Sequence, residues 1–291
     1  MTTMPIVAGA DGSAGSLRAV EWAAREAVLR KAPLRIVCAA ELLPRMSAPG
    51  SACNVQTVAS SIEAARDRAL AGAARAAHEM APDLLIDTDA VDGPAALAVT
   101  SAAAGAHLLV LGSRGSGAFS AMLLGSVSRY AAVHASCPVV VVREDTTAAH
   151  RQVVVGIRDP GDCAAALEFG FAEAALRGAS LLAVHAWQSP RAPIVPYGED
   201  PAPAAGRFPE AETAHELEQL LNDWREKYPE VTASQDAVHG HPGRVLAGLS
   251  ARADLVVLGR HHRDSRIPGP ARTVHAVLSH AHGPVAIVPS D

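Results

Sequence analysis

The chain has 291 residues, of which 49% are hydrophobic and 19% charged, with a formal net charge of −5. This length and apolar content predict about two folded domains and exclude a disordered chain. The sequence has no run of about 20 apolar residues, which excludes a membrane span, and its acidic balance and 3% aromatic content argue against nucleic-acid binding.

The start of the chain, the cysteines and the lysines favour a cytoplasmic protein with no reactive lysine motif. Met1–Pro5 shows no basic stretch followed by an apolar run, so no secretory signal is expected. Neither Lys31 nor Lys227 follows a glycine-rich turn, which excludes a Walker-type phosphate site. The cysteines form no CxxC pair and are expected to be buried or incidental thiols: Cys38, Cys53, Cys137 and Cys163.

The sequence contains two copies of one pattern, offset by 147 residues and, near the end, by 146. An ordered match of this length indicates an internal repeat. We therefore predict two tandem domains, 1–147 and 148–291, joined through the polar stretch near 144–151. The matching pairs are Val7–Gly9 with Val154–Gly156, Leu109–Gly112 with Val256–Gly259, and Cys137–Val142 with Gly283–Val288.

In the first copy, short apolar segments alternate with helical patterns. A helix is expected from Leu17 to Val28, with Ser13 and Ser16 as N-cap candidates. Strands that are apolar throughout and separated by helices predict an α/β fold: two tandem doubly wound, Rossmann-like domains, each a five-stranded parallel sheet in the order 3-2-1-4-5 with flanking helices. The expected elements are strands at Ile6–Ala10, Leu34–Ala40, Leu84–Val91, His107–Leu111 and Val139–Val142, and further helices at about 56–80, Pro94–Ala104 and about 126–135.

Ligands of such sheets bind beyond the carboxyl ends of the strands, where the strand order reverses. Here the reversal falls between the first and fourth strands, so the segments that follow them should form the site. Asp11 follows the first strand, and a Gly-x2-Gly-x9-Gly-Ser segment, from Gly112 to Ser126, follows the fourth. Its glycines let backbone N–H groups approach an anion, and its last two residues begin a helix, whose N-terminus favours phosphate.

Side chains in the same segments add to this prediction. The Ser126 hydroxyl can donate to a phosphate, and Arg114 can supply positive charge. Asp11 can accept hydrogen bonds from a ribose or help to hold a metal ion bound to the phosphates. The dinucleotide-binding pattern G-x-G-x-x-G is absent after the first strand, because the glycines there are Gly9, Gly12 and Gly15 with an acid in the turn.

These segments, Gly9–Ser13, Gly112–Gly115, Leu124–Ser128 and Cys137–Val142, resemble the universal stress protein family, and the whole chain resembles its tandem form. The resemblance implies a domain related to the adenine-nucleotide α-hydrolases that binds ATP, or AMP, with Mg²⁺ or Mn²⁺ on the phosphates. It implies that Ala10 and Asp11 face the nucleoside and that the backbone near Ala39 meets adenine. The residues implied to hold the phosphates are Gly112, Arg114, Gly115, Gly125, Ser126 and Val127.

The resemblance also implies a nucleotide-dependent regulator of stress response, dormancy or growth. Such a protein would act on a protein partner that the sequence does not name, with little or no hydrolysis. The final strand is expected to pair two domains, within the chain or in a homodimer. The alternative is a slow ATP hydrolase or pyrophosphatase of the α-hydrolase group, but the loop offers no positioned base, so no catalytic residue and no protein metal ligand is assigned. ATP, AMP and a cyclic nucleotide remain open as the ligand.

The second copy departs from this pattern at each discriminating position. Arg158 stands in the place of Asp11, His262 in that of Gly115, and Ala271-Arg272 in that of Gly125-Ser126. We therefore predict that only the first half binds ATP in the usual manner. The second half is instead rich in basic side chains near the same sheet edge, which leaves three readings open: a solvated loop, a different anion site or a histidine metal site. Those side chains are His239, His241, His261, His262, Arg158, Arg263 and Arg272.

Overall fold

The computed structural model describes residues 4–40, 55–115, 124–143, 149–159, 162–187, 209–260 and 272–290. The elements of the first half are β1 (Ile6–Gly9), α1 (Ala14–Arg30), β2 (Leu34–Ala40), α2 (Val55–Met80), β3 (Ile86–Asp92), α3 (Ala95–Ala102), β4 (Leu108–Gly112), α4 (Ser126–His134) and β5 (Val139–Val142). Those of the second half are β6 (Gln152–Gly156), α5 (Ala164–Arg177), β7 (Ser180–Trp187), α6 (Pro209–Lys227), β8 (Ala233–His239), α7 (Pro242–Leu249), β9 (Leu255–Arg260), α8 (Arg272–His280) and β10 (Val285–Pro289).

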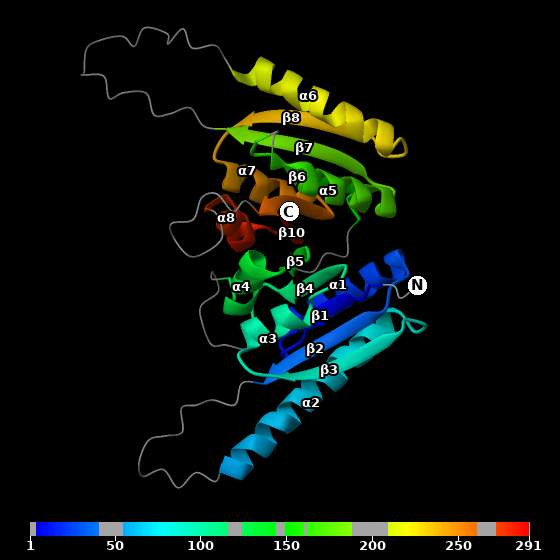
Figure 1. The fold of residues 1–291 in the computed structure, drawn as a ribbon, viewed down its shortest axis with the longest axis vertical. Coiled ribbons are helices and arrows are strands. Elements are labelled where there is room, and N and C mark those ends of the chain that lie inside the picture. Colours follow the sequence, from blue (N-terminus) through cyan, green and yellow to red (C-terminus); the bar gives the residue numbers. More distant parts are fainter. Residues whose placement is uncertain are drawn as a thin grey trace, which may run out of the picture.

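The ten strands within the described residues belong to one sheet, in the order β3-β2-β1-β4-β5-β10-β9-β6-β7-β8. Neighbouring strands are parallel within each half, whereas β5 and β10 pair antiparallel at the junction, with Val140 opposite Ala286. The two halves therefore lie one above the other in Figure 1, related by an approximate two-fold axis between β5 and β10. The α/β fold class predicted from the repeat is confirmed, and the pairing of final strands occurs within the chain.

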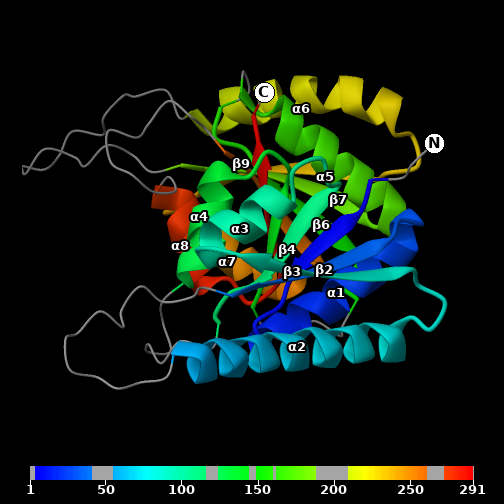
Figure 2. The same cartoon turned by 60° about the horizontal axis from the view of Figure 1, so that its bottom comes forward.

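Helices cover both faces of this sheet and enclose two apolar cores (Figure 2). One core contains residues of α1, α2, α5 and α6, and the other contains residues of α3, α4, α7 and α8. Successive strand residues point to opposite faces, so Val110 joins the first core and Leu109 the second. This double burial explains why the central strands are apolar at nearly every position.

The outer strand β3 contradicts the expectation that every strand is apolar throughout. It begins at Ile86 rather than Leu84, and none of its seven residues is buried. Leu85, just before it, is 76% exposed. The reason is its position at the edge of the sheet, where polar side chains such as Asp87 and Asp89 also discourage pairing with another chain.

The first helix begins as predicted at one of the two candidate caps. Ser13 is the N-cap of α1, and its Oγ accepts a hydrogen bond from the Ser16 N–H at 3.1 Å. Ser16 lies inside the helix, so its assignment as a cap was wrong; its hydroxyl donates to the Ser13 carbonyl instead, at 2.9 Å. This arrangement fixes the turn between β1 and α1, which carries Asp11.

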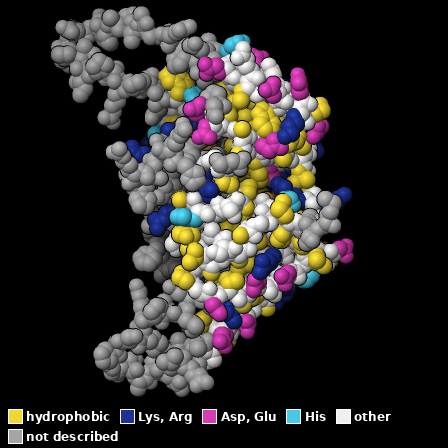
Figure 3. All heavy atoms as spheres, viewed as in Figure 1, with side chains coloured by type: hydrophobic (Ala, Val, Ile, Leu, Met, Phe, Trp, Pro, Cys, Tyr) yellow, Lys and Arg dark blue, Asp and Glu magenta, His cyan; other side chains and the backbone are white. Residues whose placement is uncertain are grey.

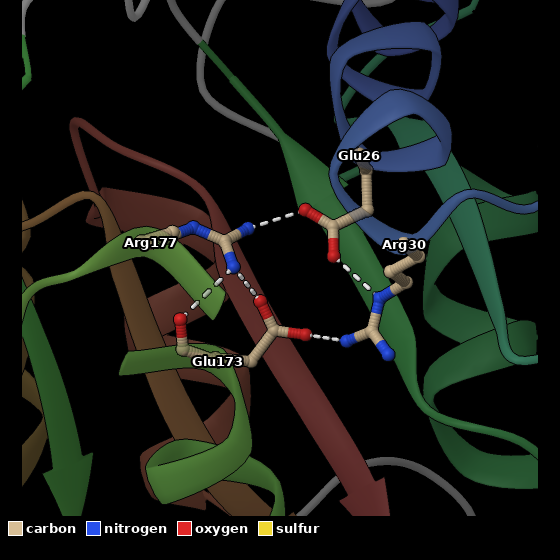
Figure 4. A network of polar contacts seen from close by, with 4 residues as sticks. All are labelled: Glu26, Arg30, Glu173 and Arg177. Atoms are coloured by element: carbon tan, nitrogen blue, oxygen red, sulfur yellow. Dashed lines mark hydrogen bonds and ion pairs between the residues drawn. The ribbon is translucent and has the colours of Figure 1, made fainter. Parts of the chain in front are cut away.

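A buried ring of charged side chains joins the two halves (Figure 4). Glu26 and Arg30 of α1 contact Glu173 and Arg177 of α5, and each guanidinium pairs with both carboxylates. The two carboxylate side chains are only 1% and 0% exposed. Glu173 and Arg177 stand 147 residues after Glu26 and Arg30, so the ring follows the repeat. Removal of one member of such a ring leaves an uncompensated buried charge, so each side chain depends on its partners in the other half.

Burial and the adjacent Glu26 carboxylate raise the pKa of Glu173 to about 7, against the opposing effect of the two arginines.

The two arginines of the charged ring also contact aromatic side chains, and these contacts follow the repeat. The Arg177 guanidinium lies 5.8 Å from the centre of the Trp22 ring, and that of Arg30 lies 5.9 Å from the centre of the Phe169 ring. Each arginine thus contacts an aromatic side chain of the other half.

Three cysteines, Cys38, Cys137 and Cys163, are free and buried, as expected, whereas Cys53 lies outside the described residues. Burial raises the pKa of Cys137 and of Cys163 to about 11. Among the described residues, no helix combines the length and apolarity needed to cross a membrane.

Candidate functional site

A pocket of about 670 Å³ lies at the carboxyl ends of β1, β2 and β4. All nine residues that the sequence and its resemblance placed in a ligand site line this pocket: Ala10, Asp11, Ala39, Gly112, Arg114, Gly115, Gly125, Ser126 and Val127. They come from four separate stretches of the chain, which the reversal of strand order between β1 and β4 brings together.

The turn after β1 holds the Asp11 carboxylate in place. The Ala10 N–H donates to the Val37 carbonyl at 2.9 Å, which continues the pairing of β1 with β2. Asp11 donates its N–H to the Ser16 Oγ at 3.2 Å, and its Oδ1 accepts from the Ser13 N–H at 3.0 Å. The other carboxylate oxygen faces Gly115, where an added Cβ would lie only 2.4 Å from Asp11 Oδ2.

The end of β4 packs backbone to backbone against the start of α1. A Cβ on Gly112 would lie 2.7 Å from the carbonyl carbon and oxygen of Gly15, and a Cβ on Gly15 would lie 2.7 Å from the Arg114 carbonyl oxygen. Only glycine fits at these two positions without displacing backbone. The close approach places the loop after β4 directly beside the Asp11 turn.

The first turn of α4 forms another side of the pocket. Gly125 is its N-cap, and the Gly125 N–H donates to the Ser113 carbonyl at 2.8 Å. The Ser128 hydroxyl donates to the Gly112 carbonyl at 2.7 Å, which ties the helix to β4. Within the described ranges no side chain caps α4, and helical geometry leaves its first N–H groups without intrahelical acceptors. The pocket therefore receives the positive end of a helix.

The remaining lining combines an apolar wall with cationic side chains. Ala39 of β2 and four further apolar residues supply the wall: Ala95, Val99, Leu111 and Leu124. Arg114 and Arg129 supply two guanidinium groups, whereas Asp11 supplies the one carboxylate among the residues that line the pocket. A site of this composition can hold a flat apolar group at one end and an anion at the other.

Several lining residues were not predicted as site residues: Ser16, Ala95, Val99, Leu111, Leu124, Ser128, Arg129 and His275. Ser128 belongs to the Leu124–Ser128 segment that carried the resemblance, so its hydrogen bond to Gly112 could have been suspected. The apolar residues read as ordinary core positions. His275 comes from α8 of the second half, and no signal within the first half points to it.

The corresponding edge of the second half is built differently where the structure describes it. Arg158 and Asp159 follow β6 and are exposed. Arg260, at the end of β9, donates from Nη1 to the Ala135 carbonyl of the first half at 2.6 Å. His239 packs edge-on against Trp187, with ring centres 4.7 Å apart, and His241 is the N-cap of α7.

Of the predicted histidine- and arginine-rich cluster, the structure describes Arg158, His239, His241 and Arg272. The other three residues, His261, His262 and Arg263, lie outside the described residues, as does Ala271. In the part of the chain that the structure describes, no group of three or more His, Cys, Asp or Glu side chains is arranged to hold a metal ion.

The fold and this pocket together define a tandem pair of doubly wound α/β domains with a glycine-lined pocket at the sheet edge of the first. The model of the universal stress protein family matches residues 2–143 and 149–289. The chain is 33% identical to the universal stress protein Rv1996 of Mycobacterium tuberculosis, over 100% of this chain and 97% of that protein. The chain belongs to the universal stress protein family.

Other relatives agree with this assignment. A universal stress protein of Mycolicibacterium smegmatis is 32% identical over 90% of this chain and 88% of its own length. The crystal structure of a universal stress protein from Archaeoglobus fulgidus matches with a TM-score of 0.73 at 15% identity, covering 99% of both chains. At that identity the likeness supports the fold alone.

Proposed function

We propose that the first half binds an adenine nucleotide, ATP in the first instance, and that its occupancy regulates a partner protein in stress response, dormancy or growth. One observation carries the proposal: two glycine-rich turns and the N-terminus of α4 converge on a pocket that apolar side chains also line. This arrangement suits a phosphate chain at one end and a flat base at the other.

In this proposal each lining residue has a physical task. The backbone near Ala39, on β2, meets the adenine, and Asp11 accepts hydrogen bonds from the ribose. Backbone N–H groups from Gly112 to Gly115 and from Gly125 to Val127 hold the phosphates, and Arg114 adds charge. The Ser13–Asp11 hydrogen bond supports this role because it already orients the carboxylate before a ligand arrives.

The lining residues fit a metal ion carried by the nucleotide rather than one held by the protein. Asp11 is the one carboxylate among them, and the described residues contain no three-ligand cluster. Mg²⁺ usually keeps several waters and binds phosphate oxygens of the substrate. Because Asp11 is assigned to the ribose, phosphate oxygens and water would hold the ion, Mg²⁺ or Mn²⁺, which would neutralise charge on the phosphates.

We propose further that the second half does not bind ATP in the same way. The Arg158 guanidinium occupies the place of the Asp11 carboxylate, so it cannot accept a hydrogen bond from a ribose. Arg260 takes the place of Ser113 and donates across the junction instead. The first difference would remove the hydrogen-bond acceptor for the ribose. The second commits Arg260 to the Ala135 carbonyl of the first half.

Calorimetric titration of the full chain with ATP, AMP and cyclic AMP in the presence of Mg²⁺ tests both statements. One nucleotide site per chain is the expected result. Two equivalent sites would refute the distinction between the halves, and no binding of any of the three would refute the proposed function. Mass spectrometry of nucleotide released from freshly purified protein identifies the natural ligand.

The hydrolase alternative is decided by turnover. A regulator is expected to release phosphate or pyrophosphate at well below about 0.1 per second, the lower end of ordinary enzyme rates. Sustained release faster than this, lost in an Asp11→Asn variant, would favour the enzyme.

A further inference from the structure

One side chain of the second half reaches the pocket of the first. His275, on α8, lines the pocket together with Arg129 of α4. The two residues are equivalent in the repeat, at an offset of 146, and each is the fourth residue of its helix. Both side chains are exposed, so neither is committed to the apolar core.

The junction between the halves explains why α8 lies there. Helices α4 and α8 precede β5 and β10, the strands that pair antiparallel, and they lie side by side in Figures 1 and 2. Arg143 of the first half donates from Nη1 to the Leu278 carbonyl on α8 at 2.8 Å, and Arg260 binds the Ala135 carbonyl just after α4. These two bonds fix the position of α8 relative to the first-half pocket.

The order of the strands places His275 at one particular end of the pocket. Along the sheet edge, Ala39 lies near the end of β2, whereas Asp11 follows β1 and Arg114 follows β4. Helix α8 precedes β10, which lies two strands beyond β4 on the side away from β2. A nucleotide with its base at Ala39 and its phosphates at α4 therefore extends toward Arg129 and His275.

The charges at this end suit an extended anion. Two guanidinium groups, Arg114 and Arg129, face the pocket against the single carboxylate of Asp11, and a histidine ring can donate a further hydrogen bond. Figure 3 shows Lys, Arg and His side chains on the surface at the level of α4 and α8.

On these grounds we propose that His275 of the second half binds the terminal phosphates of the nucleotide held by the first half. This inference rests on the proposed function and deepens it, because it makes the ligand a nucleoside polyphosphate. The second half then completes the site of the first instead of holding an equivalent site. Affinity for ATP becomes a property of both halves in their paired arrangement.

The test compares ATP, ADP and AMP titrations of the full-length wild type, His275→Ala and His280→Ala. His280 is the matched control, because it is an exposed histidine on the same helix and does not line the pocket. Loss of one charge-assisted hydrogen bond is expected to weaken ATP binding by about 5- to 10-fold in His275→Ala, with a smaller effect on ADP and less than about 2-fold on AMP. The control is expected to match the wild type.

A fourth variant, His275→Arg, separates charge from shape. It carries a permanent guanidinium and is expected to bind ATP at least as tightly as the wild type. Unchanged ATP affinity in His275→Ala, or equal weakening of ATP and AMP, would overturn the inference while leaving the proposed function intact. A wild type that binds none of the three nucleotides would instead overturn the proposed function itself, and the inference with it.

Discussion

The two halves are alike where the repeat is buried and unlike where it meets the ligand edge. A Cβ on Gly9 would lie 2.6 Å from Leu111 Cδ2, and a Cβ on the equivalent Gly156 would lie 2.6 Å from Leu258 Cδ2. The first strand of each half is thus packed against the fourth in the same way. Two residues further on, the first half has Asp11 and the second half has Arg158 at the equivalent position. Core packing tolerates little change, whereas an exposed turn can change its charge without cost to the fold.

The largest effect is expected from the buried charged ring, where the two halves are most alike. Glu173→Ala leaves two guanidinium groups buried beside a single carboxylate, which is expected to destabilise the protein by about 3–5 kcal/mol. Glu26→Ala should cost a similar amount, because its carboxylate is equally buried. Urea unfolding followed by circular dichroism measures both.

The control for this prediction is Glu79→Ala. Glu79 pairs with Arg75 at 4.0 Å, but the two side chains are 73% and 77% exposed. Exposed pairs contribute at most about 1 kcal/mol, so this variant should unfold close to the wild type. Equal losses in all three variants would show that burial does not set the importance of the ring.

The second prediction separates structural from ligand-binding glycines in the first half. Gly112→Ala forces a Cβ against the Gly15 backbone and is expected to cost about 1–3 kcal/mol of stability. Gly115→Ala meets only the Asp11 carboxylate tip, a side chain that can rotate, so stability should change little while ATP affinity falls about 5- to 10-fold through displacement of that carboxylate. Thermal unfolding and calorimetric titration give the two quantities.

A double variant tests whether Asp11 carries the Gly115 effect. With Asp11→Ala already present, Gly115→Ala should weaken ATP binding little further, because the colliding carboxylate is gone. Additive losses would mean that Gly115 acts on the ligand through its own backbone alone.

Much of this site could be predicted from the sequence, and the reason is its local character. Asp11, Ser13, Gly112 and Gly115 belong to short segments at the ends of β1 and β4. The reversal of strand order between these two strands places the segments together. His275 could not be placed in this way, because its position depends on the antiparallel pairing of β5 with β10. The charged ring was missed for the same reason: Glu26 reads as an ordinary helix-surface residue until α5 packs against it.

A third prediction exchanges the residues by which the halves differ. Asp11→Arg gives the first half the residue of the second and is expected to weaken ATP binding by about 10-fold, since the ribose loses its acceptor. Arg158→Asp should not create a second ATP site, because Arg260 remains engaged at Ala135. Titration of both variants for affinity and stoichiometry decides; two sites in Arg158→Asp would show that a single charge separates the halves.

The smallest effects concern the buried thiols, which occupy different positions in the two halves: Gly283 takes the place of Cys137, and Ser16 that of Cys163. Burial raises the pKa of Cys137 in the first half and Cys163 in the second to about 11, and Asp159 and Asp162 add to the shift of Cys163. Burial, with the charge of Asp11, also raises the pKa of Cys38. Because the thiolate is the reactive form, all three should resist iodoacetamide at pH 8 in the native protein and react once it is unfolded.

The measurement uses a Cys53→Ser variant, so that only the three described thiols remain, with modification counted by intact mass.

The raised pKa values of Cys137 and Cys163 also predict a weak dependence of the free energy of unfolding on pH. A thiol whose pKa is higher in the folded state than its ordinary value of 9.0 binds its proton more tightly when folded. Its contribution is complete below pH 9 and is lost as the pH rises from 9 toward 11. Cys163→Ser should reduce this loss, and rapid native alkylation of Cys137 or Cys163 at pH 8 would contradict the burial of that thiol.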